Sequence, residues 1–149
     1  MFNCPNCKKN VEDYESKCSL CGQDLSKGQW AYKNAPLGNS EAQFWLGLAY
    51  KFGVYVEQDA AKYHDWTLQA ARNGNSKAMA EIGTLYISLY FNNTNGDVKF
   101  YEDGLYWLIK ARDRGETIAI NNLDQLGIIN AHFLGSDDTH SLVHIEMRE

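Results

Sequence analysis

A chain of 149 residues has room for one compact domain with a small appendage. Its net charge of −5 argues against a general nucleic-acid binder, because such proteins need clustered positive charge. No apolar run approaches the ~18–20 residues of a membrane span, and the first four residues carry none of the features of a secretory signal. We therefore expect a cytoplasmic protein whose acidity is either that of an ordinary solvated surface or that of a docking face.

Two cysteine motifs come first along the chain, and together they contain all 4 cysteines. Cys4 and Cys7 are separated by two residues, as are Cys18 and Cys21. This spacing lets both thiolates of a turn reach one ion, and two such turns complete a tetrahedral sulfur site of the structural zinc type. Residues 2–25 resemble a short zinc ribbon, which implies that the four cysteines bind one structural zinc ion.

Other uses of the four cysteines are an iron centre or another soft metal, and disulfides or redox-active dithiols. A cytosolic chain disfavours disulfides. About 25 residues cannot bury enough apolar surface to fold alone, whereas zinc contributes on the order of 10–16 kcal/mol in finger-like peptides. Four thiolates leave no open coordination position, so we expect the metal to hold shape and not to catalyse a reaction.

Helices are predicted over most of the remaining chain. Residues 24–29 are predicted to be a polar linker, followed by a helix over 30–35 that Pro36 ends. Ser40 and Gln43 predict a capping box at the start of the next helix, and Asp59 predicts the N-cap of a helix that Gly74 ends. Further helices are expected over 76–90 and 98–114, with a surface loop at 92–97 and a capping helix over 120–129. After a turn at 135–139, the last residues are a strand, a short helix or a frayed tail.

An internal repeat organises this helical part. With an offset of 36, the 21 positions from 30 to 50 contain 8 identities, which begin with Trp30 on Trp66 and end with Tyr50 on Tyr86. The pattern returns with an offset of 41, which places Trp66 on Trp107 and Gly74 on Gly115. A period in this range is typical of a solenoid of stacked repeats.

The repeat residues resemble the Sel1-like repeats, relatives of the tetratricopeptide repeats, over roughly residues 30–123. The matching positions are Ala42, Gly47, Tyr50, Gly53, Val56, Asp59, Lys62, Trp66, Ala70, Ala71, Gly74 and Ala78. The pattern departs at Tyr55 and Leu89, which replace loop glycines, and at Tyr63, which replaces a small alanine. The resemblance implies a mainly α fold, an α-α superhelical solenoid with a zinc ribbon (1–27), helical repeats with a C-terminal capping helix (28–133) and a tail (134–149).

Three predictions concern how these parts pack. The helix over 30–35 lacks the first helix of its repeat, so the ribbon either covers this end of the array or moves freely on its linker. Trp30, Trp66 and Trp107 share one repeat position and are predicted to be core residues, while Gly47 is predicted to let two helices approach closely. Trp45 aligns with Glu81 and is therefore predicted to face outward, where it is either covered by the ribbon or binds a partner.

No recognisable catalytic constellation is present in the sequence. His64 lies far from any cysteine, and His132, His140 and His144 have no metal-ligand spacing. We therefore predict a non-enzymatic protein–protein interaction module, an adaptor or scaffold that binds a peptide or protein on the repeat groove. The family resemblance implies an alternative, an immunity protein that neutralises a bacterial toxin or effector. A nucleic-acid-associated zinc-ribbon protein is a further alternative, disfavoured by the balanced charges of residues 1–29.

Overall fold

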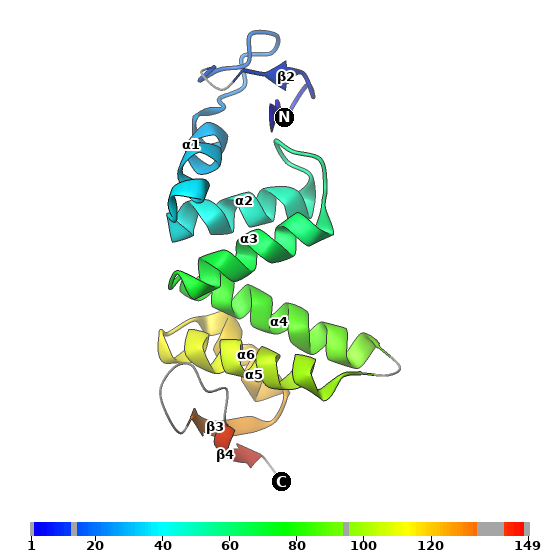
Figure 1. Cartoon of the computed structure of the whole chain (residues 1–149), viewed down its shortest axis with the longest axis vertical. Coiled ribbons are helices and arrows are strands. Elements are labelled where there is room, and N and C mark those ends of the chain that lie inside the picture. Colours follow the sequence, from blue (N-terminus) through cyan, green and yellow to red (C-terminus); the bar gives the residue numbers. More distant parts are fainter. Residues whose placement is uncertain (1, 13–14, 94–95, 134–141, 148–149) are drawn as a thin grey trace. The chain divides into compact units, whose positions relative to one another are not determined.

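The computed structural model describes residues 2–12, 15–93, 96–133 and 142–147, and it forms two compact units, Met1–Asn75 and Ser76–Glu149. The first unit contains β1, β2, α1, the short 3-10 helix η1, α2 and α3, and the second contains α4, α5, α6, β3 and β4 (Figure 1). The predicted mainly helical class is confirmed. Among the described helices, none combines the length and the apolar character that a membrane crossing requires.

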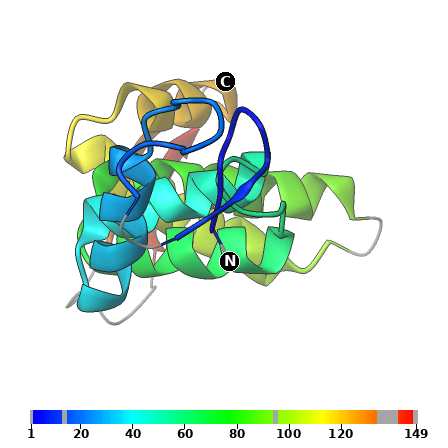
Figure 2. The ribbon, with the colours of Figure 1, turned by 90° about the horizontal axis from the view of Figure 1, so that it is seen from above.

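A small cysteine-containing segment, residues 2–25, opens the first unit. β1 (Phe2–Asn3) pairs antiparallel with β2 (Asn10–Val11), so that Asn3 lies opposite Asn10. Figure 2 shows residues 2–11, in dark blue, beside residues 16–25, in lighter blue. Strands of two residues have little stability of their own, so the segment depends on a cluster of buried side chains: Phe2, Cys4, Val11, Cys18 and Leu25.

The first helix, α1 (Ser26–Asn34), begins earlier than predicted. Leu25 is fully buried in the cysteine-containing segment, and the Ser26 N–H donates a hydrogen bond of 2.8 Å to the Asp24 carboxylate, which fixes the start of the helix. The prediction of a linker is therefore wrong for residues 26–29. The helix stops at Asn34 and is followed by η1 (Ala35–Leu37), which contains Pro36. This confirms the prediction that the proline ends α1.

The three repeat tryptophans differ in burial. Trp107 is 8% exposed and Trp66 is partly buried against the core of the first unit, but Trp30 is 36% exposed, so its predicted core position is wrong. In the described part of the first unit no helix precedes α1. The face of α1 that carries Trp30 therefore has no earlier helix to pack on, and α1 instead buries Gly28 and Ala31.

An antiparallel pair, α2 (Ser40–Phe52) and α3 (Ala60–Arg72), forms the core of the first unit. The Asn73 side chain at the end of α3 donates a hydrogen bond of 2.8 Å to Gln43 near the start of α2. Midway along the pair, a Cβ on Gly47 would lie 2.6 Å from Thr67 Oγ1. This confirms that Gly47 allows the two helices to approach closely.

Asn39, and not Ser40, caps α2. Its backbone is extended, and its side-chain oxygen accepts a hydrogen bond of 2.9 Å from the Ala42 N–H. Gln43 cannot complete the predicted capping box, because its amide group donates to Ala35 O at 3.1 Å and accepts from Asn73. The predicted capping box is therefore wrong. The cap lies one residue earlier, and the Gln43 side chain bonds to Ala35 and Asn73 and not to the start of α2.

Asp59 caps α3, as predicted. Its Oδ1 accepts a hydrogen bond of 3.0 Å from the Lys62 N–H, and this bond lowers the pKa of Asp59 below its ordinary 3.8. Because the folded pKa is the lower one, the cap stabilises the fold above the unfolded pKa, and this contribution is lost as the pH falls through the folded pKa. We expect the Lys62 amide resonance to titrate with a midpoint below 3.8, and Asp59→Asn, which caps without titrating, to abolish the transition. A midpoint at or above 3.8 would contradict this account of the cap.

The second unit is built on another antiparallel pair, α4 (Ser76–Asn92) and α5 (Val98–Asp113), close to the predicted bounds. The helices cross at two glycines. A Cβ on Gly83 would lie 2.8 Å from Leu108 Cγ, and a Cβ on Gly104 would lie 2.9 Å from Ile87 Cδ1. Residues 94–95 of the predicted loop lie outside the described residues.

A short helix and a hairpin follow. α6 (Thr117–Gln125) is tied to α4 by a hydrogen bond of 2.6 Å from Asn122 to Thr84 Oγ1. Gly127, with φ 73°, ends this turn of the chain, and β3 (Ile128–Phe133) then pairs antiparallel with β4 (Leu142–Met147). The predicted helix over 120–129 is therefore wrong beyond residue 125, and the strand alternative holds for 142–147. The predicted turn at 135–139 and His140 lie outside the described residues, and the predicted boundaries 1–27, 28–133 and 134–149 stay predictions.

Candidate metal centre

The four cysteines lie on two turns that repeat the same backbone hydrogen bonds. In the first turn, the Lys8 N–H donates to Cys4 O at 2.9 Å, and the Cys4 N–H donates to Lys9 O at 2.8 Å. In the second turn, the equivalent bonds join Gly22 to Cys18 and Cys18 to Gln23, both at 2.8 Å. This local symmetry makes each Cys-x-x-Cys motif a rigid pair of sulfur ligands.

Both turns need a left-handed residue directly after their second cysteine. Gly22 meets this need with φ 73°, but the first turn uses Lys8 with φ 61°. A side chain in this region costs roughly 1–2 kcal/mol, and glycine costs about 0.5–1 kcal/mol of unfolded-state entropy. We therefore expect Lys8→Gly to stabilise the metal-loaded protein by roughly 0.5–1 kcal/mol and Gly22→Ala to destabilise it. Urea denaturation of both variants tests this, and a destabilised Lys8→Gly would contradict it.

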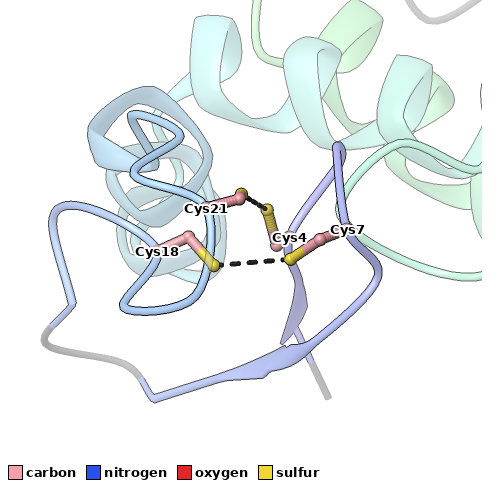
Figure 3. Close-up of side chains that lie close together, drawn as sticks. All are labelled: Cys4, Cys7, Cys18 and Cys21. Atoms are coloured by element: carbon pink, nitrogen blue, oxygen red, sulfur yellow. Dashed lines mark hydrogen bonds between the residues drawn. The ribbon is translucent and has the colours of Figure 1, made fainter.

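The sulfurs are arranged as a closed four-ligand set (Figure 3). Cys4 Sγ lies 3.5 Å from Cys21 Sγ, and Cys7 Sγ lies 3.6 Å from Cys18 Sγ. All four sulfurs lie within 4.8 Å of one another, and all four cysteines are free. Sulfurs that coordinate one ion tetrahedrally at ~2.3 Å are about 3.8 Å apart. The donor set therefore fits a single tetrahedral metal ion, and no disulfide joins the four residues.

Backbone N–H groups lower the pKa of two of these thiols. The Cys21 N–H contributes most to lowering the pKa of Cys18, and the Gln23 N–H contributes most to lowering the pKa of Cys21 to about 6. For Cys7 the Lys9 N–H also lowers the pKa, but desolvation and the neighbouring thiols raise it to about 12. Sulfurs this close cannot all ionise without a positive charge among them, which a metal cation supplies.

Aromatic contacts join the cysteine-containing segment to the helices of the first unit. The ring of Tyr55, in the connection between α2 and α3, stacks on Phe2 with centroids 4.9 Å apart and lies 5.2 Å from Trp45. The Asn3 N–H donates a hydrogen bond to Tyr55 O at 2.5 Å. The Gln29 side chain on α1 donates to the carbonyls of residues 12 and 15. Of the two predicted arrangements, a covering ribbon and a free one, these contacts within the first unit favour the covering one.

Tyr55 keeps the left-handed conformation of the loop glycine that it replaces, with φ 69°. Its stacking on Phe2 and its tilted ring contact with Trp45 account for the tolerance of this strained backbone. Trp45, the predicted partner-binding residue, is half-buried and packs against the core of the first unit. Sequence reasoning identified the departure at Tyr55 but not its role, because nothing local links residues 2 and 55. The left-handed Lys8 had no sequence signal.

Among the described residues, the group of metal-ligand side chains at the cysteine site includes no histidine. His64 lies 3.4 Å from the Asp65 carboxylate on the surface of α3. The β3–β4 register places residue His132 opposite His144, a pairing that the sequence spacing did not indicate. In the part of the chain that the structure describes, the four cysteines are the one group of three or more metal-ligand side chains.

Comparison with solved structures finds a protein of similar fold. No family model matches the chain, and no curated protein matches it. The chain is similar to a protective antigen present in uropathogenic Escherichia coli strains, whose crystal structure displays an SLR (Sel1-like repeat) fold. The two share 27% identity with a TM-score of 0.59, over 72% of this chain and 22% of the length of that protein. The chain therefore has a mainly helical fold similar to that of a Sel1-like repeat protein, and its four N-terminal cysteines lie close enough together to hold one metal ion, as in a zinc ribbon.

Proposed function

We propose that this chain is a non-enzymatic protein–protein interaction module whose N-terminal ribbon is held by one structural zinc ion. The observation that carries the proposal is the Sel1-like repeat fold. Solenoid repeats expose extended surfaces built from many small units, and such surfaces bind peptides and proteins. The partner is expected to be a peptide or a protein, bound with no membrane and no nucleic acid.

Zinc is the proposed ion because four thiolates in a tetrahedral arrangement are the ligand set of closed structural zinc sites. When bound, the ion supplies charge and cross-linking, and the chain supplies all four ligands. Cys4 and Cys18 are buried, and the backbone N–H groups of both turns orient and stabilise the thiolates. A closed set leaves no position for a substrate or a reactive water, which supports a structural role.

The alternative partners stay predictions. A toxin or effector would be one case of a protein partner, and a net charge of −5 would suit a cationic one. A nucleic acid fits less well, since the net charge is negative and the charges of residues 1–29 balance. Trp45 remains the proposed partner contact, with the part of its ring that Tyr55 leaves accessible.

The test is direct binding by the intact, zinc-loaded protein. Proteins captured from an extract of the native cell are purified and titrated against the chain by calorimetry, with Trp45→Glu as the comparison. We expect a saturable one-to-one complex. Failure of every captured protein to bind once purified, or turnover of a substrate by the zinc-loaded chain, would contradict the proposal, and unchanged binding by Trp45→Glu would remove that residue from the contact.

A further inference from the structure

A polar groove runs along the junction between the ribbon and the helices of the first unit. It consists of two hollows of about 540 and 430 Å³ between the β1–β2 sheet and the connection from α2 to α3. Four residues line both hollows, so we treat the hollows as one groove: Asn3, Asn10, Val56 and Glu57. All of its lining residues belong to the first unit.

Asn3 lines this groove and has an unused hydrogen-bonding atom. Its backbone N–H is bonded to Tyr55 O, but its side-chain Oδ1 is buried and accepts no hydrogen bond from any described residue. Buried polar atoms are satisfied in most proteins, so an exception calls for an explanation. Asn10 lies directly opposite Asn3 in the sheet and is exposed, and opposed residues of an antiparallel pair have their Cβ atoms about 4.5–5.5 Å apart. The groove therefore carries two neighbouring carboxamides.

The charges of the groove cancel. Glu57 and Asp59 are its acids, and Lys8 and Lys62 are its bases. Asp59 is already engaged, since it caps α3 and its Oδ2 lies 3.6 Å from Lys62 Nζ. A phosphate would need an excess of positive charge and a metal ion an excess of negative charge. A neutral lining with both donors and acceptors, above a buried Val56, fits a neutral polar ligand.

We infer that this groove binds the backbone of an extended peptide segment of the partner. A carboxamide has one acceptor and two donors, which matches the alternating N–H and C=O groups of a peptide. On binding, rotation of the Asn3 side chain turns Oδ1 from its buried, unpaired position toward the groove, where it accepts a hydrogen bond from one backbone N–H. The exposed Asn10 carboxamide bonds to a neighbouring backbone group. The inference rests on the proposed function and names its surface. The groove requires the metal-bound ribbon, because β1 leads directly into Cys4.

The test uses linear peptides selected from a random phage-displayed library against the intact, zinc-loaded chain. In spectra of the ¹⁵N-labelled protein, saturation with a selected peptide is expected to shift the side-chain amide signals of Asn3 and Asn10. The signal of Asn6, an exposed amide of the same ribbon that does not line the groove, is expected to stay unchanged. Asn3→Ala is expected to weaken binding roughly fivefold or more, and Asn6→Ala to bind as the wild type does.

Thermal melts separate binding from structure. Asn3→Ala removes a buried acceptor that lacks a donor, so its melting temperature is expected to equal or exceed that of the wild type. Asn10→Ala, at an exposed position, provides a second variant with the same expected loss of binding. If the selected peptides bind both variants with wild-type affinity, the groove is not the site, although the interaction module stands. If no peptide is selected against the wild-type protein, the groove inference is also overturned. The titration with purified partners then tests the proposed function separately.

Discussion

Removal of the metal is expected to unfold the ribbon and to loosen the first unit while leaving the second unit folded. The ribbon has two strands of two residues each, and its apolar cluster is assembled around the buried Cys4 and Cys18. Metal binding contributes on the order of 10–16 kcal/mol to the folding of small zinc peptides, far more than so small a cluster supplies. Without the ion, the four sulfurs, which lie within 4.8 Å of one another, lose the metal bonds that join the two turns.

The measurement is a ¹⁵N spectrum of the intact protein before and after chelation. Amide signals of residues 2–25 are expected to collapse to unfolded positions, and those of Gly28 and Tyr55 to shift, because both residues contact Phe2. The signal of Leu108, in the second unit, is expected to stay in place. Cys18→Ser is expected to reproduce the chelated spectrum, and Ser19→Ala, in the same turn, to retain the metal. A dispersed ribbon spectrum after complete metal removal would show that the ion is not required for the fold.

Gly83→Ala is expected to destabilise the second unit by about 1–3 kcal/mol, the usual cost of overpacking. A Cβ at this position would lie 2.8 Å from Leu108 Cγ, 2.9 Å from Gly104 O and 3.0 Å from Leu108 N. Alanine gains about 1 kcal/mol in helix propensity over glycine. Two of the three contacts are with backbone atoms that cannot move without separating α4 from α5, so the steric cost outweighs that gain.

Urea denaturation of Gly83→Ala, followed at the indole N–H signal of Trp107 in ¹⁵N spectra, tests this prediction. Ser88→Ala provides the control, since it changes an exposed residue of the same helix and is expected to alter stability by less than about 0.5 kcal/mol. Equal or greater stability of Gly83→Ala would mean that the two helices are not held at the observed separation.

Features with a fixed spacing could be predicted from the sequence. The cysteine spacing indicated the metal site, the Trp30-to-Tyr86 repeat indicated the helix pairs, and Gly47 indicated close packing. Each is a pattern whose chemistry permits few alternatives. Choices between adjacent candidates could not be predicted, because Asn39 and Ser40 are equally good caps and the difference lies in Gln43, which the structure uses elsewhere.

Other misses depended on contacts between distant parts of the chain. Burial of Trp30 would require a helix before α1, and the described part of the first unit has none. The repeat pattern predicts equivalent positions, but it does not predict whether a neighbouring helix is present at each of them. The sequence pattern after residue 125 still favoured a helix. In the structure α6 ends at Gln125, Gly127 has a left-handed backbone, and β3 begins at Ile128. Tyr55 and Lys8 hold a left-handed backbone conformation without being glycine. The contacts of Tyr55 with Trp45 and with Phe2, 53 positions earlier in the chain, explain the first of them.

The most direct test of a closed, purely structural metal centre is X-ray absorption at the metal edge of the protein purified with its native metal. We expect zinc with four sulfur neighbours at ~2.3 Å and no nitrogen or oxygen in the coordination sphere. A sphere of three sulfurs and one oxygen, which would give the ion an open reactive position, would contradict it.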